Sequence, residues 1–190
     1  MTKAILLDRD GVINKKASKG DYIKSEEAFE WLPGAKEAIK VFKERGHLVL
    51  VISNQRGIAR GLMTQEDVGE IHDSIQQDLG KIGARIDRFY YCPHDDKDNC
   101  SCRKPKTGLI EKALEEFHFE PKESFLVGDA ETDIEMGKKM GLKTILVLSG
   151  QTKTKDEALY WNSRPDLILP DLSAVASVCP PLVKTMPAPR

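Results

Sequence analysis

Residues 4–11 read Ala-Ile-Leu-Leu-Asp-Arg-Asp-Gly, an apolar run that changes at once into two acidic residues and a glycine. Four apolar residues closed by polar residues and glycine are typical of a buried β-strand that leads into a loop. The same form recurs at residues 48–52, 86–91, 125–127, 144–148 and 167–169. These runs predict a sheet of buried strands.

The stretches between these runs carry apolar residues at helical spacing. Residues 34–45 place several apolar side chains on one face, and Gly46 is expected to end that helix. Similar spacing predicts helices over residues 64–82, 109–117 and 132–140, and Thr107 is expected to cap the helix over residues 109–117. Strand and helix alternate along the chain. This alternation predicts an α/β fold with a Rossmann-like, doubly wound and mostly parallel sheet, covered by helices on both faces.

The length of 190 residues suits one domain with a full hydrophobic core, because a chain of this size buries roughly 70% of its unfolded surface. We expect this domain to span residues 1–179 and to leave no room for a large cap domain. Residues 180–190 are rich in proline and are expected to form a flexible tail.

Charge and hydropathy exclude several classes of protein. The chain has 29 basic and 30 acidic residues, so it lacks the basic surface expected of a nucleic-acid-binding protein. Its longest aliphatic run, residues 48–52, is far shorter than the roughly 20 residues of a membrane-spanning helix, and its start lacks the apolar segment of a signal peptide. We therefore expect a cytoplasmic protein with no nucleic-acid or membrane partner. We also expect it to be a monomer, although the sequence does not determine the oligomeric state.

Polar and acidic residues follow three of the predicted strands. Asp8 and Asp10 follow the first, residues 53–55 (Ser-Asn-Gln) follow the second, and Asp129 follows the fourth, with Asp133 four positions later. Ligands bind beyond the carboxyl ends of open parallel sheets, so these side chains are expected to meet there. Each aspartate could simply cap a loop or helix, but carboxylates crowded together need a divalent cation or a shared proton. Hard oxygen ligands favour Mg²⁺.

These three motifs, with Lys104 between the second and the third, resemble the four successive motifs of the haloacid dehalogenase superfamily in its phosphatase form. The resemblance implies that Asp8 is the nucleophile and forms an aspartyl phosphate. It also implies that Asp10 is the general acid and base, which donates a proton to the leaving alkoxide and later takes one from the hydrolytic water.

The same resemblance implies a catalytic Mg²⁺ ion. Asp8, the backbone carbonyl of Asp10 and Asp129 would hold the ion, which would neutralise charge on the phosphoryl oxygens. Asp133 is expected to orient a metal-bound water or Lys104 rather than to bind the ion directly.

Further residues are expected to contact the phosphate. The resemblance implies that Ser53, the backbone amide of Asn54 and Gln55 hold phosphoryl oxygens. Lys104 would supply a fixed positive charge, and Arg103 beside it a second one. Both cations could instead be ordinary surface charges.

Residues 92–102 hold a cluster of possible metal ligands, namely Cys92, His94, Cys100 and Cys102. Three thiolates and one imidazole complete a tetrahedral set for zinc and leave no vacant position, so we expect a structural Zn²⁺ ion. Disulfide pairing is the alternative, although disulfides are rare in cytoplasmic proteins. Bound zinc would order this polar loop and fix the two basic residues that follow it.

The pattern Cys-x-His with Cys-x-Cys-Arg-Lys-Pro, together with residues 55–61, resembles the D-glycero-D-manno-heptose bisphosphate phosphatases and the related histidinol-phosphate phosphatase domains. The resemblance implies removal of the C7 phosphate of the heptose bisphosphate during synthesis of nucleotide-activated heptose for surface glycans such as lipopolysaccharide. Histidinol phosphate is the alternative substrate, because both activities share the catalytic motifs and the cysteine cluster. Ser53 departs from the family, in which threonine is frequent at this position.

Two more substrate contacts are expected from loops. Residues 14–32 are polar and exceed the length of an ordinary loop, so they are a candidate substrate lid that carries Tyr22; a simple surface insertion is the alternative. Arg60 could meet the second, non-reacting phosphate, or it could be a solvated arginine.

Other classes of function stay open at this point. A phosphate-sensing receiver domain also uses a doubly wound sheet and a phosphorylated aspartate, but it needs no acid at the position of Asp10. A zinc-binding interaction module leaves the acidic residues at the strand ends unexplained.

Overall fold

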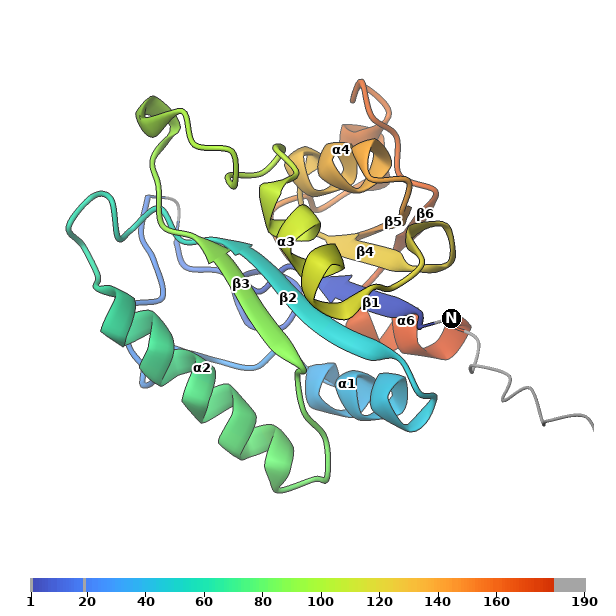
Figure 1. The fold of residues 1–190 in the computed structure, drawn as a ribbon, viewed down its shortest axis with the longest axis horizontal. Coiled ribbons are helices and arrows are strands. Elements are labelled where there is room, and N and C mark those ends of the chain that lie inside the picture. The colour runs from blue at the N-terminus through green and yellow to red at the C-terminus, as the bar shows by residue number, and fades with distance from the viewer. Residues whose placement is uncertain (1, 19, 180–190) are drawn as a thin grey trace, which may run out of the picture.

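The computed structural model describes residues 2–18 and 20–179. The strands are β1 (Ala4–Leu7), β2 (Leu48–Asn54), β3 (Arg88–Cys92), β4 (Phe125–Gly128), β5 (Lys143–Val147) and β6 (Leu167–Leu169). They form one parallel sheet in the order β3-β2-β1-β4-β5-β6 (Figure 1). The predicted doubly wound parallel sheet is confirmed. The proline-rich residues 180–190 lie outside the described part of the chain.

Two hydrophobic cores lie on opposite faces of the sheet. Successive residues of β1 alternate between them, because Ile5 and Leu7 belong to one core and Ala4 and Leu6 to the other, all fully buried. The helices are α1 (Ala35–Glu44), α2 (Gln65–Gly80) and α6 (Leu172–Val178) on the first face, and α3 (Gly108–Phe117), α4 (Glu131–Lys139) and α5 (Lys155–Ala158) on the second. Two short 3-10 segments, η1 (Asp96–Asp98) and η2 (Pro121–Glu123), complete the elements.

The predicted helices are present with small shifts of their ends, but the predicted cap of α3 is wrong. Thr107 has a helical backbone conformation, and its side chain makes no hydrogen bond to the first amides of the helix. Its hydroxyl donates instead to Oε1 of Glu111 at 2.6 Å. A capping side chain needs an extended backbone, as Thr64 has at the start of α2, where it accepts from the amide of Asp67 at 3.0 Å.

Strand β3 begins at Arg88, two residues later than the apolar run suggests. The reason is that a side chain makes the backbone hydrogen bonds at Ile86 that a neighbouring strand would otherwise make. Gln76 of α2 accepts from the amide of Ile86 at 3.0 Å and donates to its carbonyl at 2.7 Å. Ile86 is buried, and both its amide and its carbonyl group are hydrogen-bonded. Its apolar side chain therefore indicates a buried position and does not indicate that the residue pairs with a strand.

The chain reverses its direction of travel across the sheet at β1. From β1 it moves outward through β2 to β3, and it then returns to the other side of β1 to build β4, β5 and β6 (Figure 1). Such a switch point opens a crevice beyond the carboxyl ends of the two strands that flank it, here β1 and β4. Every helix of residues 2–18 and 20–179 falls short of the length and apolar character needed to span a membrane.

Candidate active site

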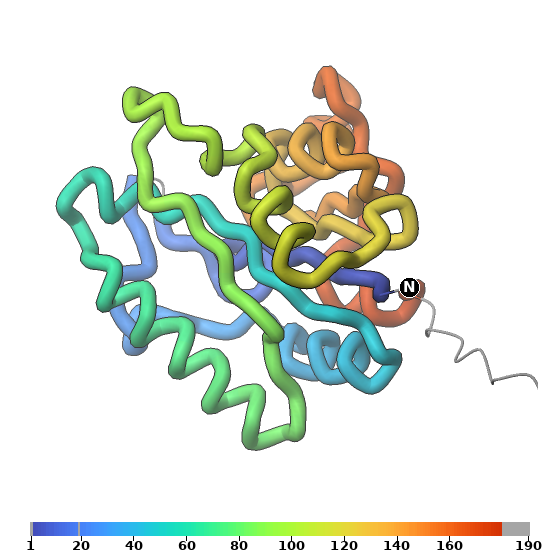
Figure 2. The backbone as a smooth tube through the Cα atoms, viewed as in Figure 1, coloured from blue at the N-terminus to red at the C-terminus, as the bar shows by residue number. Residues whose placement is uncertain are grey.

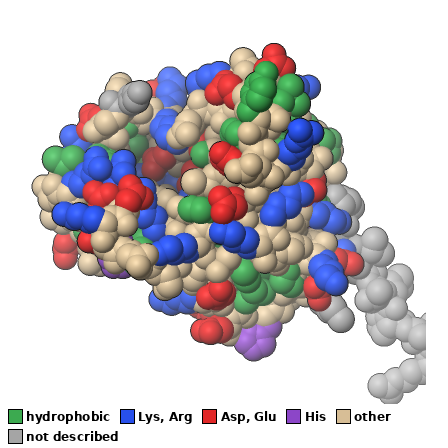
Figure 3. Space-filling model, turned by 90° about the horizontal axis from the view of Figure 1, so that it is seen from above, with side chains coloured by type: hydrophobic (Ala, Val, Ile, Leu, Met, Phe, Trp, Pro, Cys, Tyr) green, Lys and Arg blue, Asp and Glu red, His purple; other side chains and the backbone are tan. Residues whose placement is uncertain are grey.

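A cleft of about 540 Å³ opens at this switch point. From the strand ends and the turns that follow them it is lined by Asp8, Asp10, Ser53, Asn54 and Asp129, and from the first turn of α4 by Asp133. Tyr22, Arg103 and Lys104 line it from loops. The space-filling view of Figure 3 shows this face hollowed, with acidic side chains in the depth of the hollow and Lys and Arg side chains gathered along one side. The cleft wall formed by the described residues does not include Gln55 or Arg60.

Lys104 is buried between two carboxylates at the centre of the cleft. Its Nζ lies 2.8 Å from Oδ1 of Asp8 and 2.6 Å from Oδ1 of Asp133, and it donates to the carbonyl of Ile52 at 3.1 Å. Burial alone would lower the pKa of Lys104, but the two carboxylates outweigh it and raise this pKa above its usual value. Burial raises the pKa of Asp8, and Lys104 opposes that rise. The lysine is therefore a fixed cation beside Asp8.

Asp129 presents an oxygen atom that has no partner. It is fully buried; its Oδ2 accepts from the amide of Gln151 at 2.6 Å and from Nζ of Lys16 at 2.9 Å. Its Oδ1 is buried without a hydrogen-bond partner among the described residues. Burial and the charge of Asp8 raise the pKa of Asp129, against the effect of Lys16. An unsatisfied buried carboxylate oxygen is costly and fits a site for a cation.

Three carboxylates are close enough to share one ion. Oxygen atoms of Asp8, Asp129 and Asp133 all lie within 4.8 Å of one another. Both oxygens of Asp133 are already engaged, since Lys104 contacts Oδ1 and the amide of Ala130 donates to Oδ2 at 3.2 Å. The donor set fits a hard divalent cation such as Mg²⁺. Direct binding by Asp8 and Asp129, with an indirect role for Asp133, stays a prediction.

Two glycines let the chain pass close to these carboxylates. Gly11 has φ of +101°, which a side chain would strain, and a Cβ there would lie 2.2 Å from Oδ2 of Asp129. A Cβ on Gly128 would lie 2.2 Å from Cβ of Asp133. The turn after β1 and the end of β4 therefore need glycine to bring both acidic groups into the cleft.

Asp10 is held by three donor side chains. Nη2 of Arg9 lies 3.0 Å and 2.9 Å from its two oxygens, Asn14 donates to Oδ1 at 2.9 Å, and Gln55 donates to Oδ2 at 3.0 Å. Burial raises the pKa of Asp10, but Arg9 together with the two amides outweighs it and lowers this pKa below its usual value. Gln55 also donates to Oγ of Ser53 at 2.7 Å, so it supports the cleft from behind.

Arg9 and Asn14 are contacts that the sequence did not reveal. Arg9 stands between two acidic residues and looks like a spacer, whereas it is fully buried behind the cleft. Asn14 bridges Asp10 and the backbone of Lys15, to whose carbonyl it donates at 2.8 Å. The alternation rule offered one signal for Arg9, because neighbours in an extended chain point to opposite sides.

The end of β2 is tied to the basic loop that carries Lys104. Ser53 lies buried at the edge of the cleft. Asn54 accepts from the amide of Lys104 through Oδ1 at 3.1 Å, which ties the two segments together. The backbone amide of Asn54 and the hydroxyl of Ser53 remain the predicted phosphate contacts on this side.

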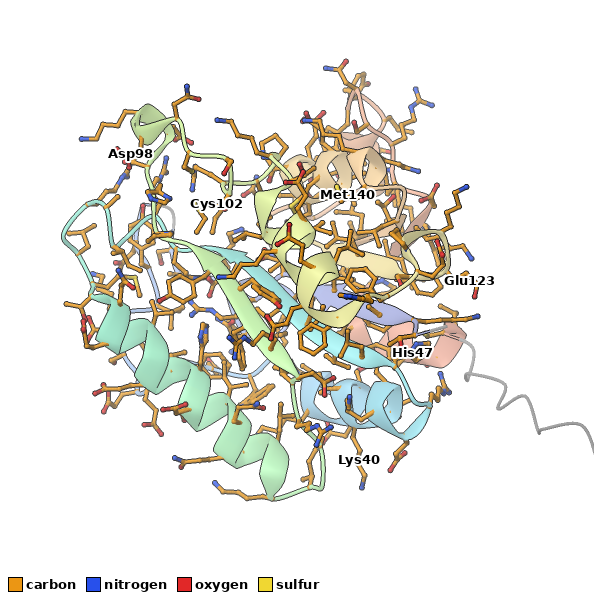
Figure 4. All side chains as sticks on the ribbon, viewed as in Figure 1. Lys40, His47, Asp98, Cys102, Glu123 and Met140 are labelled. Carbon is orange, nitrogen blue, oxygen red and sulfur yellow. The ribbon has the colours of Figure 1, made fainter. Side chains whose placement is uncertain are left out.

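The cysteine cluster is assembled beyond the end of β3. Among its ligand atoms, the Cys92–Cys102, Cys100–Cys102 and Cys92–Cys100 sulfur pairs are 3.1, 3.5 and 3.6 Å apart, and Nδ1 of His94 lies 3.2 Å from Sγ of Cys102. Ligands of one tetrahedral zinc ion lie roughly 3.5–3.8 Å apart, given bond lengths of about 2.0–2.3 Å. All four cysteines of the described chain are free thiols, so the cluster fits zinc better than a disulfide. Figure 4 labels Cys102 and Asp98 on this protruding loop.

The loop of residues 14–32 borders the cleft opposite the basic segment. Lys16 and Tyr22 of this loop line the cleft, and Oη of Tyr22 accepts from Nε of Arg56 at 3.3 Å. The tube of Figure 2 shows this loop beside the turn that follows β2. Arg60, the other arginine of that turn, bonds to Asp95 at 2.8 Å. Its predicted role at a second phosphate stays untested, and Arg56 is the arginine that reaches the cleft.

The switch-point sheet and the cluster of strand-end carboxylates around a buried lysine define a phosphatase of the haloacid dehalogenase (HAD) type. The HAD-hydrolase-like family model matches residues 101–175. The enzyme from Neisseria meningitidis called D-glycero-beta-D-manno-heptose-1,7-bisphosphate 7-phosphatase is 39% identical over 153 residues, which cover 80% of each chain. The corresponding alpha-heptose enzyme from Mycobacterium bovis is 42% identical over 133 residues, 70% of each chain. The chain belongs to the D-glycero-D-manno-heptose-1,7-bisphosphate 7-phosphatase family.

A solved structure agrees with this assignment. The D,D-heptose 1,7-bisphosphate phosphatase from B. bronchiseptica, complexed with magnesium and phosphate, superposes with a TM-score of 0.85 at 31% identity. The match covers 93% of this chain and 97% of that one. Family membership makes the protein a phosphoric monoester hydrolase, so the receiver-domain and zinc-module alternatives are not supported.

Proposed function

We propose that the protein removes the C7 phosphate of D-glycero-D-manno-heptose 1,7-bisphosphate through an aspartyl-phosphate intermediate. The observation that carries this proposal is the cleft at the switch point, where Asp8 faces Lys104 and Asp10 stands two residues away. The names of the relatives supply the substrate, and the site supplies the chemistry. No feature of the site favours histidinol phosphate over the heptose.

Asp8 attacks phosphorus in line, and the bond between phosphorus and the sugar oxygen breaks. Oδ1 of Asp8 accepts from Lys104 and from the amide of Arg9 at 2.8 Å, which orients Oδ2 as the attacking atom. Lys104, Ser53 and the amide of Asn54 stabilise charge on the phosphoryl oxygens. Water then attacks phosphorus, which releases phosphate and regenerates the Asp8 carboxylate.

Asp10 moves the protons in both steps. It donates to the sugar oxygen as that oxygen leaves, and it later accepts a proton from the attacking water. In the free protein its three donor partners keep it ionised. A bound phosphoryl group adds negative charge beside Asp10, which raises its pKa, so Asp10 takes up its proton as the substrate binds.

Two metal ions complete the proposal. Asp8, the backbone carbonyl of Asp10 and Asp129 would hold Mg²⁺, which when bound supplies positive charge that favours ionised Asp8 and offsets the charge of the phosphoryl oxygens. The free Oδ1 of Asp129 supports this assignment. Zinc on the cysteine cluster would have a structural role, since its ligands leave no vacant position for a substrate.

The setting of the reaction follows from family and composition. We assign the product to the synthesis of nucleotide-activated heptose for surface glycans such as lipopolysaccharide. A cytoplasmic location suits a cluster of free thiols, because a reducing compartment preserves them. We propose a monomer that acts on a small molecule, and the near-neutral charge supports the expectation of no nucleic-acid or membrane partner.

One comparison of substrates tests the proposal. We expect kcat/KM for at least one anomer of the heptose 1,7-bisphosphate to exceed that for histidinol phosphate by more than about 100-fold, because relatives named for both anomers are similar to this chain. Release of phosphate from C1, or preference for histidinol phosphate, would overturn it. Asp8→Asn is the control for contaminating phosphatases.

A further inference from the structure

Lys16 reaches across the cleft to the far half of the sheet. It belongs to the loop of residues 14–32 and lies outside any helix or strand. Its Nζ lies 2.9 Å from Oδ2 of Asp129 and 3.4 Å from Oε1 of Gln151, which follow β4 and β5. The lysine is therefore held over the carboxylates by side-chain contacts and not by regular structure.

Two lysines share the task of balancing the carboxylates. Lys104 contacts Asp8 and Asp133, and Lys16 is the one cation of residues 2–18 and 20–179 that contacts Asp129. The side chain of Lys104 is 4% exposed, whereas that of Lys16 is 39% exposed. A buried ammonium group that loses its partners stays desolvated, but Lys16 can exchange its partner for water. Lys16 is therefore the cation that can leave.

Asp129 can offer its two oxygens to two different cations. Its Oδ2 accepts from Lys16, and its buried Oδ1, without a partner in the described chain, is the atom that supports the proposed Mg²⁺ site. Two cations on one carboxylate repel each other, and the divalent ion has twice the charge of the lysine. Oε1 of Gln151 gives a displaced ammonium group an uncharged acceptor at the edge of the cleft.

We propose that Lys16 is a built-in counter-ion that competes with Mg²⁺ for Asp129: it balances this carboxylate in the metal-free protein and is displaced when the ion binds. This inference rests on the proposed function, because it concerns the metal site of that reaction. The competition lowers the affinity for Mg²⁺. It also couples metal binding to the loop of residues 14–32, which lines the cleft through Tyr22 as well.

Calorimetric titration with Mg²⁺ alone tests the competition. Gel filtration into Mg²⁺-free buffer prepares the full chain without a chelator, so any metal on the cysteine cluster is kept. Lys16→Gln should lower Kd for Mg²⁺ about tenfold, because the competing charge is gone. Lys15→Gln is the matched control, since Lys15 is the neighbouring residue, carries the same charge and pairs with Glu30 on the surface. Its Kd should stay within about twofold of the wild type at constant ionic strength.

Thermal unfolding gives a second readout, because a competition must act in both directions. In Mg²⁺-free buffer, Lys16→Gln leaves Asp129 without its cation and should lower Tm by about 3 °C. At saturating Mg²⁺ the lysine no longer contacts Asp129, so the difference from the wild type should fall below about 1 °C. A lysine with a merely structural role would lower Tm equally under both conditions.

Two results would overturn the inference: a Kd for Mg²⁺ in Lys16→Gln that equals or exceeds that of the wild type, or a loss of Tm that is the same with and without Mg²⁺. Failure of the proposed metal site looks different, since the wild type and both variants would then bind no Mg²⁺, and the inference would fall with that site.

Discussion

Nη2 of Arg9 lies 3.0 Å from Oδ1 and 2.9 Å from Oδ2 of Asp10, so the residue between the proposed nucleophile and the proposed acid is paired with the acid. Arg9 is fully buried, and the Asp10 side chain is 21% exposed. Asn14 and Gln55 each donate a further hydrogen bond to Asp10. The position of the proposed acid is therefore set by three side chains that do not line the cleft.

Removal of Arg9 should destabilise the protein. Arg9→Gln leaves Asp10 without its counter-charge, and losing one partner of a buried ion pair costs about 3–5 kcal/mol. Urea denaturation at pH 7 measures the change in the free energy of unfolding. Arg85→Gln on the surface should change it by less than about 0.5 kcal/mol. An Arg9→Gln protein as stable as the wild type would contradict a stabilising role for the pair.

The same variant should respond differently to acid. Because the folded-state pKa of Asp10 is lowered, its contribution to stability is fully present above the ordinary value of 3.8 and is lost as the pH falls through the lowered value. Without Arg9, burial dominates and raises the pKa of Asp10. We therefore expect the stability difference between wild type and variant to shrink as the pH falls from the raised pKa of Asp10 in the variant to its lowered pKa in the wild type. A difference that is constant from pH 7 to pH 3 would speak against this.

The sequence predicted the sheet because each strand carries its own signal. The runs at β1 and β2 are apolar throughout, as buried parallel strands require, and the turn residues after them mark the strand ends. Two local predictions were wrong because side-chain hydrogen bonds replace the backbone hydrogen bonds that the pattern predicts. Gln76 replaces a strand neighbour at Ile86, and Thr107 bonds to a side chain in place of the helix amides.

The sequence predicted only those residues of the site that belong to a recognisable motif. Asp8, Lys104 and Asp129 were placed together because strand ends and family motifs locate them. Contacts between loop residues that lie far apart in the sequence could not be predicted. Lys16 reaches Asp129 across 113 positions, and Arg56 reaches Asp96 across 40, through loops whose conformation no short pattern specifies.

Asp8→Asn should abolish turnover and keep the fold. A carboxamide cannot attack phosphorus, so phosphate release should fall by at least about 1,000-fold. Burial raises the pKa of Asp8, which means that its charge is costly in the folded protein, and the neutral amide removes this cost. We expect an equal or higher Tm in thermal unfolding. Residual turnover above about 10% would exclude the covalent route through Asp8.

Metal analysis under reducing conditions tests the cysteine cluster. We expect purified wild-type protein to hold close to one zinc ion per chain, and Cys100→Ser to lose most of it, because three ligands bind zinc far less tightly than four. Cys179→Ala is the matched control, since Cys179 is buried beside His47, away from the cluster. Zinc content that is unchanged in Cys100→Ser, or absent from the wild type, would contradict the assignment.

A double-mutant cycle tests the coupling of Lys104 with Asp133. Lys104→Met leaves two buried carboxylates facing each other, so we expect a loss of about 3–5 kcal/mol. Asp133→Asn keeps an acceptor for the amide of Ala130 and leaves Lys104 paired with Asp8, so its cost should be smaller, about 1–2 kcal/mol.

The double variant should be more stable than the sum of the single effects predicts, by about 1–3 kcal/mol, because the second change removes the charge that the first one exposed. Urea denaturation with Mg²⁺ chelated measures all four proteins, and Lys40→Met at an ion pair on the surface of α1 controls for loss of a lysine.

The folded-state pKa of Lys104 is raised, so the contribution of Lys104 to stability is fully present below pH 10.5 and is lost only as the pH rises through the raised pKa. The coupling energy should therefore be constant between pH 6 and 9. Additive effects would mean that the contact at 2.6 Å contributes no interaction energy, and Asp133 would then have to act on Lys104 through geometry alone.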